Sequence, residues 1–417
     1  MSKILFLSMP SHGHMNPMLG LAAKLIEQGE EITFFSADEF KTSVEEIGAE
    51  FKCYKEDLNI FGRKNKQVEK TGADEAASKL PGAGLAHAFL QPEKFIDNLL
   101  VEINGLKFGY LIFSAAYPYA STIAKILNIP AISSFAVFAT LNELRKGKPT
   151  GQDKDSMSKD SGPLGMNPEV IEAFKKVRQN LIEKYQVEIA ENIFDLFINK
   201  GDLNIVYTSK YFIPNLKNYD DSFIFIGPPV FNKQYHVEFP FEKLEGKKVI
   251  YISMGTIFSN HSVELNKLFF DSFADMDVIV VMAAYQVDVS QYNIPGNFII
   301  RDYVPQLELL KYTSVAITHS GMNSIGDLLY HNVPFVAIPL GADQFYLAGR
   351  AQDLGATIML DVNNLSKETL KNAVEKVSSE PSYRENIKKI SDSFVEAGGY
   401  QKGVEEIFKL KKELSID

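Results

Sequence analysis

The amino-terminal stretch of residues 3–36 reads KILFLSMPSHGHMNPMLGLAAKLIEQGEEITFFS. It begins with a continuous apolar run at residues 3–9 and ends with another at residues 31–36, and both runs are rich in strand-forming side chains. Between them, Asn16 and Pro17 are typical of a helix cap and of the first helical position, and apolar residues follow at helical spacing. The stretch therefore predicts a βαβ unit, and hence a parallel sheet with a right-handed crossover.

Units of the same kind recur along the rest of the chain. Further buried strands are predicted at residues 110–113, 129–133, 249–253, 278–282, 298–300, 315–318 and 335–338. The proline pair at residues 228–229 and the aperiodic stretch that follows it mark a linker between two sets of strands. We therefore expect an α/β protein with an amino-terminal domain at residues 1–228 and a second domain at residues 229–398, facing each other across a ligand-binding cleft. Residues 399–417 are expected to form a carboxy-terminal helix that can cross back to the first domain.

The composition restricts the class of protein. Of the 417 residues, 45% are hydrophobic and 23% are charged, which is typical of a soluble globular chain. The net charge of -10 argues against binding to nucleic acid or to an anionic membrane, because both require a positive field. Cys53 is the single cysteine, which excludes a disulfide framework and a cysteine-rich metal site. We see no targeting segment and no run of about 20 apolar residues, so we expect a cytoplasmic protein with no integral membrane segment.

The strand at residues 315–318 runs directly into the sequence HSGMNS at residues 319–324, which opens a helix. Small and polar residues at a helix start leave several backbone N–H groups free, and the helix dipole adds about half a positive charge there. Such a turn is suited to bind a phosphate, and His319 can donate a further hydrogen bond to it. A glycine-containing turn alone, however, is weak evidence for a phosphate site.

Polar residues at neighbouring strand ends strengthen this interpretation. Asp327 lies two helical turns after His319 and can accept hydrogen bonds from a ribose diol. Residues 304–306 offer backbone groups and an amide to the edge of a base, and the Gly-Thr pair at residues 255–256 can approach a diphosphate or a sugar. The Asp-Gln pair at residues 343–344 is suited to sugar hydroxyls. Each feature alone is also compatible with an ordinary loop, a helix cap or a solvated surface.

Together, the features between residues 303 and 344 resemble the donor-binding motif of the UDP-glycosyltransferases, glycosyltransferase family 1. The likeness extends to Gly-His and Asn-Pro within residues 13–17, to residues 225–228 and to residues 253–256, and it is greatest to the bacterial macrolide-type members. It implies the GT-B architecture, in which two Rossmann-like domains face each other across a cleft. It also implies a UDP-sugar donor held by the residues that match the motif: Gly255, Thr256, Pro305, Gln306, His319, Gly321, Asn323, Ser324, Asp327, Asp343 and Gln344.

The resemblance implies a role for each part of this motif. Gln306 would contact the uracil and Asp327 the ribose. Asp343 and Gln344 would hold the sugar, and this pair favours glucose. The family usually has Glu where this chain has Asp327, so the shorter side chain implies a rearranged or water-mediated ribose contact. The diphosphate would be bound by residues at the helix start, namely His319, Asn323 and Ser324.

The same resemblance identifies His14 as the general base that takes the proton of the acceptor. A helix amino terminus disfavours the imidazolium ion, so we expect His14 to be neutral at pH 7. Without the family match, a histidine that merely caps a turn is the better explanation of the position. His12 has no counterpart in the family, and we expect it to be a loop residue.

In the family an Asp orients this histidine, but the strand end that should carry it has Ser114 in this chain. No acidic residue occurs between Glu102 and Glu143. A hydroxyl can fix the tautomer of the ring but cannot balance the charge that the ring gains, so an orienting role for Ser114 is doubtful. Three explanations remain open: another carboxylate replaces the Asp, with Asp38 as the nearest candidate; the acceptor is an acidic phenol or carboxylate; or the protein binds a sugar nucleotide without transferring it.

The sequence thus predicts an inverting glycosyltransferase that moves a hexose, preferably glucose, from a UDP-sugar to a hydroxyl of a small apolar or aromatic natural product. We expect no cofactor and no metal requirement, and a monomer or weak homodimer. The acceptor pocket is expected from residues 61–90, 115–119 and 135–141, where plain core packing is an equal alternative. The polar segment at residues 145–166 is either a solvated insertion or a lid.

Two rival functions remain. A non-catalytic sugar-nucleotide-binding protein would explain Ser114, although it would not explain His14. A sugar-nucleotide epimerase of similar fold fits less well, because the pattern at residues 319–344 is that of the transferases.

Overall fold

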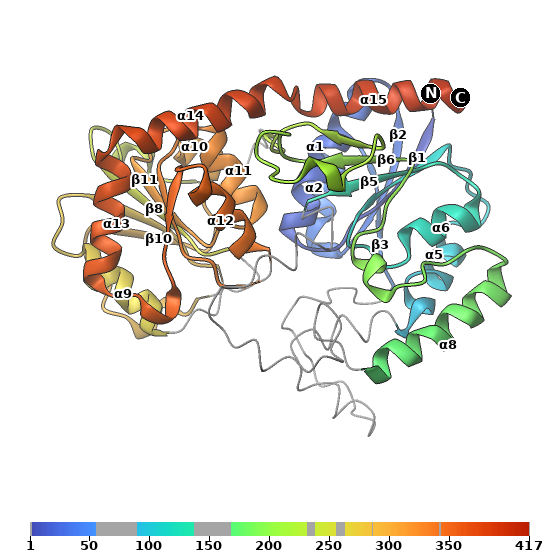
Figure 1. Cartoon of the computed structure of the whole chain (residues 1–417), viewed down its shortest axis with the longest axis horizontal. Helices are drawn as coiled ribbons and strands as arrows, with labels where there is room; N and C mark the ends of the chain where they lie inside the picture. The colour runs from blue at the N-terminus through green and yellow to red at the C-terminus, as the bar shows by residue number, and fades with distance from the viewer. Residues whose placement is uncertain are drawn as a thin grey trace.

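The computed structural model describes residues 2–55, 90–136, 168–231, 238–255, 263–285, 287–341 and 343–416. These residues form two parallel β-sheets that lie side by side, with helices packed on the faces of each (Figure 1). The predicted α/β class is therefore confirmed.

The first sheet has seven strands in the order β3-β2-β1-β4-β5-β6-β7. They are β1 (Lys3–Leu7), β2 (Glu31–Ser36), β3 (Glu50–Cys53), β4 (Tyr110–Ser114), β5 (Ala131–Phe135), β6 (Leu203–Val206) and β7 (Phe223–Phe225). Alternate residues of β1 enter two cores: Ile4 and Phe6 pack with α1 (His12–Glu27), whereas Leu5 and Leu7 pack with α6 (Ala120–Leu127). Because both faces are buried, such strands are continuous apolar runs. Further helices of this part are α2 (Lys41–Glu46), α5 (Asp97–Glu102) and α8 (Pro168–Tyr185).

The second sheet has six strands in the order β10-β9-β8-β11-β12-β13. They are β8 (Val249–Ser253), β9 (Ile279–Ala283), β10 (Phe298–Arg301), β11 (Val315–Thr318), β12 (Phe335–Ala337) and β13 (Thr357–Met359). The helices that accompany it are α9 (Val263–Phe273), α10 (Gln306–Leu309), α11 (Met322–Tyr330), α12 (Gln344–Asp353), α13 (Lys367–Ser379) and α14 (Pro381–Glu396).

In both sheets the strand order reverses beside the first strand of the set. β1 lies between β2 and β4, and β8 lies between β9 and β11. Ligands of parallel α/β sheets bind beyond the carboxyl ends of the strands at such a reversal. The connection from β1 to α1 and the turn from β11 to α11 both leave the sheets at these positions, so the fold gathers the predicted site residues there.

Helix α1 begins earlier than the sequence predicted. Its cap is Ser11, in an extended conformation, and its first residue is His12, so Pro17 lies inside the helix and does not open it. The prediction relied on the preference of proline for the first helical position. Here Pro17 comes in the second turn, where its missing N–H removes one helical hydrogen bond. His14 consequently belongs to the first turn of α1 and not to a loop.

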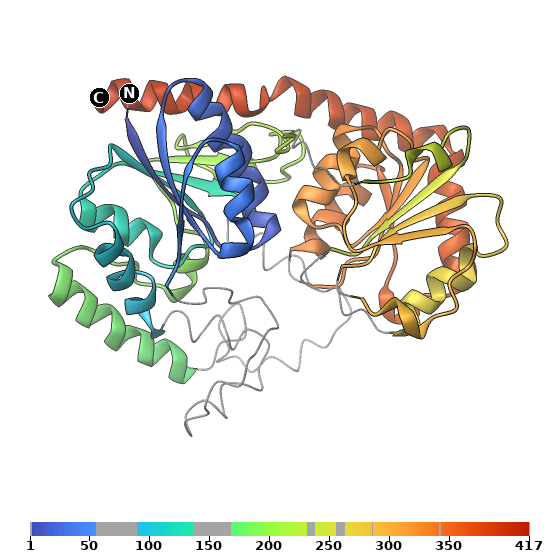
Figure 2. The same ribbon diagram turned by 180° about the vertical axis from the view of Figure 1, so that it is seen from behind.

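The carboxy-terminal helices run along both sheets. Helix α14 packs on α11, and α15 (Gly399–Glu413) packs on α1, as the view from behind shows (Figure 2). The ring of Tyr400 lies so close to Gly20 that a Cβ at Gly20 would come within 2.4 Å of it.

A buried ion pair fixes the far end of α15. Lys411 Nζ lies 2.5 Å from Glu30 Oε1, and both side chains are nearly inaccessible to solvent. The other oxygen of Glu30 accepts a hydrogen bond from the backbone N–H of Ser2 at 3.0 Å. Ser2 and Ile416 both pack against Gly109, so the two ends of the described chain lie together.

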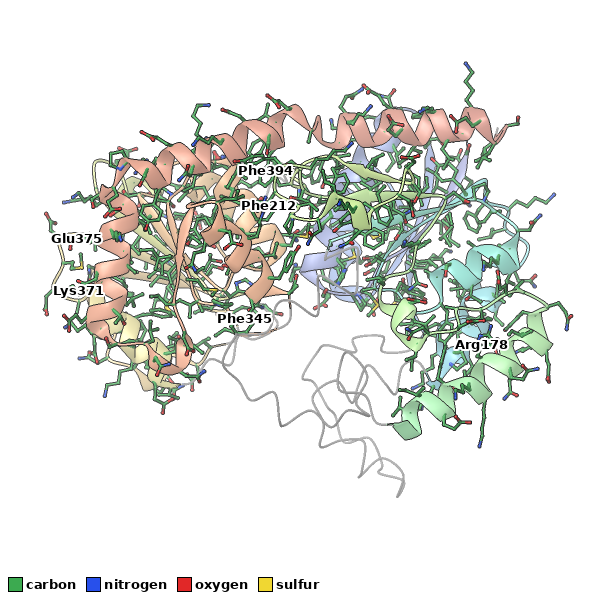
Figure 3. All side chains as sticks on the ribbon, viewed as in Figure 1. Arg178, Phe212, Phe345, Lys371, Glu375 and Phe394 are labelled. Atoms are coloured by element: carbon green, nitrogen blue, oxygen red, sulfur yellow. The ribbon has the colours of Figure 1, made fainter. Side chains whose placement is uncertain are left out.

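The two halves of the molecule also contact each other beside α14. The rings of Phe212 and Phe394 lie 5.9 Å apart (Figure 3). Arg350 Nε donates to the carbonyl of Phe212 at 2.8 Å, and the hydroxyls of Ser209 and Ser393 are 2.7 Å apart. Among the described ranges, no helix has the length and apolar character needed to cross a membrane.

Candidate active site

His14 and Ser114 meet where β4 ends and α1 begins. Ser114 Oγ lies 2.8 Å from His14 Nδ1, and both side chains are buried. Burial lowers the pKa of His14 to about 4, so the ring is neutral at pH 7. His14 and Ser114 are 100 positions apart in the sequence, and the structure brings their side chains together. A hydroxyl thus stands where the family resemblance implies a carboxylate.

Asp38 was the nearest candidate to replace the missing carboxylate. It is exposed in a short helix after β2, beside Cys53, where it adds to the effect of burial in raising the pKa of the Cys53 thiol. The described contact of Asp38 is with Cys53, which does not support Asp38 as the substitute carboxylate.

The turn between β11 and α11 is shaped around the ring of His319. A Cβ on either Gly255 or Gly321 would come within 2.5 Å of His319 Nε2, so both positions need glycine to leave room for the ring. Gly255 also has a φ of +82°, and Ser320 has a φ of 63° in the same left-handed region. The predicted contact at Thr256 lies outside the described residues.

Asn323 and Ser324 occupy the first turn of α11, as the sequence predicted. Asn323 Nδ2 donates to the carbonyl of Gly13 in α1, with 3.0 Å between the atoms. The start of the candidate donor helix therefore touches the turn that carries His14.

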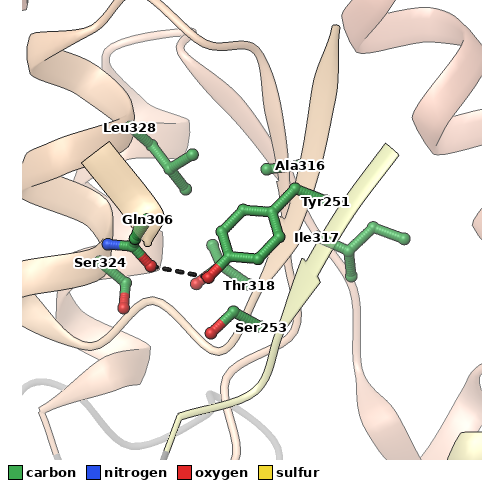
Figure 4. Close-up of a pocket in the computed structure, with 8 residues that line it drawn as sticks. All are labelled: Tyr251, Ser253, Gln306, Ala316, Ile317, Thr318, Ser324 and Leu328. Atoms are coloured by element: carbon green, nitrogen blue, oxygen red, sulfur yellow. Dashed lines mark hydrogen bonds between the residues drawn. The ribbon is translucent and has the colours of Figure 1, made fainter. Parts of the chain in front are cut away.

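Gln306 opens α10, directly after Pro305, and reaches into a pocket beside β8 and β11 (Figure 4). Its Oε1 accepts a hydrogen bond from the hydroxyl of Tyr251 at 2.8 Å, and its Nε2 donates to Asp327 Oδ2 at 2.6 Å. Gln306 thus stands next to the carboxylate for which a ribose contact was predicted. The side chains fill this space almost completely and leave no room even for a water molecule, so these described residues enclose no preformed cavity for a nucleotide.

Tyr251 is a site residue that the sequence did not predict. It lies on β8 as a buried aromatic residue, and its only signal was a hydroxyl in the middle of a mostly apolar strand. Burial raises the pKa of Asp327 to about 7, and the hydrogen bond from Gln306 opposes that rise. The carboxyl group of Asp327 is therefore poised to change its charge near neutral pH.

The Asp-Gln pair stands at the start of α12. Burial raises the pKa of Asp343, the cap of this helix, to about 6. Gln344 Oε1 accepts from the backbone N–H groups of Leu340 at 2.8 Å and Gly341 at 3.2 Å. The side-chain oxygen of Gln344 thus binds the backbone of the loop that precedes α12. The NH₂ of the same amide is therefore the group suited to a ligand.

His12 is not the loop residue that the sequence predicted: it is the first residue of α1 and lies between the two halves of the molecule. Its ring centroid lies 5.1 Å from that of Phe40 and 5.4 Å from that of Tyr303. The centroid of the Tyr285 ring lies 6.4 Å from that of His12. A contact between residues almost 300 positions apart has no local sequence signal.

The predicted acceptor segments are only partly described. Residues 61–89, 137–141 and 145–166 lie outside the described residues. Within residues 115–119, Tyr117 and Tyr119 are both packed in the core, and Tyr117 also borders a small recess together with Tyr54. In the described part of the chain, no three His, Cys, Asp or Glu side chains are grouped so that they could hold a metal ion.

Comparison with known proteins gives the family. A family model described as "UDP-glucoronosyl and UDP-glucosyl transferase" matches residues 238–395. Over 416 residues the chain is 32% identical to the "Uncharacterized UDP-glucosyltransferase YojK" of Bacillus subtilis (strain 168), which covers 99% of this chain and 98% of that protein. It is 29% identical over 411 residues to the "NDP-glycosyltransferase YjiC" of Bacillus licheniformis, covering 97% and 96% of the two chains.

A solved structure agrees with the fold. The crystal structure of CalG4, the calicheamicin glycosyltransferase, matches with a TM-score of 0.75 at 22% identity, covering 99% of this chain and 98% of that one. The predicted GT-B architecture is thereby confirmed. The chain is 32% identical to a UDP-glucosyltransferase over almost its whole length, and the family model matches across the second sheet. Together these findings show that this chain is a glycosyltransferase and belongs to the UDP-glycosyltransferase family.

Proposed function

We propose that the enzyme is an inverting transferase that moves a hexose, preferably glucose, from a UDP-sugar to a hydroxyl of a small apolar or aromatic molecule. The observation that carries this proposal is the neutral, buried His14, held 2.8 Å from Ser114 in a helical turn that touches the donor helix α11. The glucosyltransferase name of the 32% identical relative supports glucose as the sugar.

In the proposed mechanism His14 acts as the general base. Ser114 accepts a hydrogen bond from Nδ1–H, which leaves the lone pair of Nε2 to take the acceptor proton. As the O–H bond breaks, the acceptor oxygen bonds to the anomeric carbon from the face opposite the diphosphate. The bond from that carbon to the diphosphate oxygen breaks, and its electron pair leaves with UDP. The configuration at the anomeric carbon is inverted.

The low pKa of His14 favours an acidic acceptor. A base with a pKa of about 4 is a weak proton acceptor, and Ser114 adds no charge to stabilise the imidazolium ion. Transfer from a phenol, with a pKa near 10, is much less unfavourable than transfer from an aliphatic alcohol. We therefore propose phenols as the preferred acceptors.

On the donor side we propose that the diphosphate lies at the amino terminus of α11, near His319 and Ser324. Helix N–H groups and the dipole supply positive potential there, so we propose that no metal ion is required. Asp327, with Gln306, would hold the nucleoside end, and Asp343 with Gln344 would hold the hexose. Undiminished activity in excess EDTA is expected, and loss of activity would contradict metal independence.

The rival function is a protein that binds the sugar nucleotide without transferring it, and the uncharged Ser114 favours it. Incubation with UDP-glucose and a panel of phenols, followed by mass spectrometry, separates the two. Glycosylated phenols support the transferase. Tight binding of UDP-glucose in calorimetry with no product from any acceptor supports the rival.

Replacing Ser114 by aspartate is expected to raise kcat on alcohol acceptors by about tenfold, a part of the 10²–10⁴ that a general base contributes. A carboxylate beside Nδ1 raises the pKa of His14 and balances the imidazolium charge. Asparagine has the same size as aspartate but carries no charge, so Ser114→Asn should not raise kcat. Unchanged or lower turnover in Ser114→Asp, with UDP-glucose binding retained, would show that Ser114 does not occupy the partner position.

The affinity for UDP-glucose is expected to rise by about tenfold between pH 6 and pH 8, because the proposed ribose contact needs the ionised form of Asp327, whose pKa is about 7. Calorimetry should use UDP-glucose and not UDP, whose terminal phosphate titrates in the same range. Asp327→Asn should remove most of the pH dependence. Equal affinities of the unaltered protein at the two pH values would contradict the ribose contact.

A further inference from the structure

Pro17 leaves the backbone carbonyl of Gly13 without its usual helical hydrogen-bond donor. In an α-helix this carbonyl would accept from the N–H of the residue four positions later, but that residue is proline and has no N–H. Asn323 supplies the missing donor: its Nδ2 lies 3.0 Å from Gly13 O. Helices α1 and α11 accompany different sheets and face each other across the middle of the molecule (Figure 1).

The chemistry of this contact fixes the orientation of the amide. A carbonyl can only accept, so Nδ2 of Asn323 must face Gly13. Its Oδ1 is buried and has no hydrogen-bond partner in the described structure. A phosphate oxygen is itself an acceptor and cannot satisfy Oδ1, whereas a hydroxyl of a sugar or of an acceptor can. One N–H of Asn323 thus joins the two halves of the molecule, while the second N–H can donate to a phosphate oxygen and Oδ1 can accept from a hydroxyl of a ligand.

The first turn of α1 is held by three successive residues with three different partners. The ring of His12 packs against Tyr303, the carbonyl of Gly13 accepts from Asn323, and the ring of His14 contacts Ser114. Two of these partners belong to the half of the molecule that carries the donor motif. Loss of the central bond would free the turn from the donor helix.

We propose that Asn323 is a positioning residue, which clasps the base-carrying turn of α1 to the donor helix through the carbonyl that Pro17 leaves open. The clasp sets the separation between His14 and the anomeric carbon of a bound donor. This inference rests on the proposed role of His14 as the base.

The clasp can be tested without turnover by hydrogen–deuterium exchange of the full-length, ligand-free protein. Asn323→Ala should speed exchange in peptides that cover residues 10–18. The matched control is Ser393→Ala, which also removes one hydrogen bond between the two halves, to Ser209 at 2.7 Å, but far from His14 along the chain. It should leave these peptides unchanged. Exchange that is the same in Asn323→Ala and in the unaltered protein would overturn the proposal.

Kinetics distinguish a positioning role from simple donor binding. At saturating UDP-glucose, Asn323→Ala should lower kcat by about fivefold, the usual worth of one hydrogen bond. Pro17→Ala returns an N–H to Gly13 without touching α11, and should reproduce part of that loss. The double variant should be no slower than Asn323→Ala alone, since both changes act on one bond. A change in the KM for UDP-glucose alone, or fully additive losses in kcat, would overturn the proposal.

The transferase activity and the contact between Asn323 and Gly13 are tested by different outcomes. If the unaltered protein forms no product with any acceptor, the transferase proposal fails, while the exchange experiment still decides whether the clasp exists. If products form but exchange at residues 10–18 does not depend on Asn323, the clasp fails and the transferase proposal stands.

Discussion

Replacing His14 by alanine is expected to lower kcat by about 10²–10⁴, the usual contribution of a general base, while the affinity for UDP-glucose stays the same. The side chain lies on the α1 side of the site, beside Ser114, and the donor motif is carried by the second sheet. Steady-state kinetics with a phenolic acceptor and calorimetry with UDP-glucose measure the two quantities. Retention of full turnover in His14→Ala would remove His14 from the mechanism.

The pH profile of the same reaction gives an independent check. Because the pKa of His14 is about 4, kcat/KM for the acceptor should be flat between pH 5 and pH 8 at saturating UDP-glucose. It should fall as the pH decreases toward 4, since protonation of the ring removes the base. A fall centred near 6.5, the ordinary pKa of histidine, would mean that burial does not act on the ring as the structure implies.

Replacing Lys411 by alanine is expected to lower the free energy that holds α15 on α1 by about 3–5 kcal/mol. The substitution leaves the carboxylate of Glu30 buried without its cation, although the ion pair itself need not stabilise the protein relative to an apolar pair. Urea denaturation followed by circular dichroism measures the loss. Hydrogen–deuterium exchange, measured in peptides from residues 399–416, shows whether this helix is the part that opens.

The same helix supplies the control. Lys402 pairs with Glu406 at 2.7 Å on the exposed side of α15, and Lys402→Ala should cost only about 0.3–0.5 kcal/mol. Replacing both members of the buried pair by apolar residues, Glu30→Leu with Lys411→Met, should restore most of the lost stability. Equal effects of Lys411→Ala and Lys402→Ala would contradict a buried, uncompensated charge.

The sequence predicted the sheets well because their strands are local and unambiguous. Residues of β1 and β8 enter cores on both faces, so each strand is an apolar run bounded by a polar turn. The start of α1 was misplaced because Asn16 and Pro17 are a local start signal, whereas the helix begins ahead of them, after the extended Ser11. The hydroxyl of Ser11 makes no capping hydrogen bond in the described structure, so capping chemistry does not mark the true start.

The candidate site was predictable where its residues are neighbours in sequence. His319, Asn323 and Asp327 share one turn and helix, so their spacing carries information. The contacts of Gln306 with Tyr251 and of Asn323 with Gly13 join residues 55 and 310 positions apart, and depend on how strands and domains are arranged. Such contacts leave no periodicity, and only the folded chain reveals them.

The meeting of Ser2 and Ile416 at Gly109 makes this fold a candidate for circular permutation. A short peptide joining these neighbouring ends would close the backbone into a ring without distorting either sheet. New termini could then be opened in a surface turn of the second sheet, and α15 would be covalently continuous with β1.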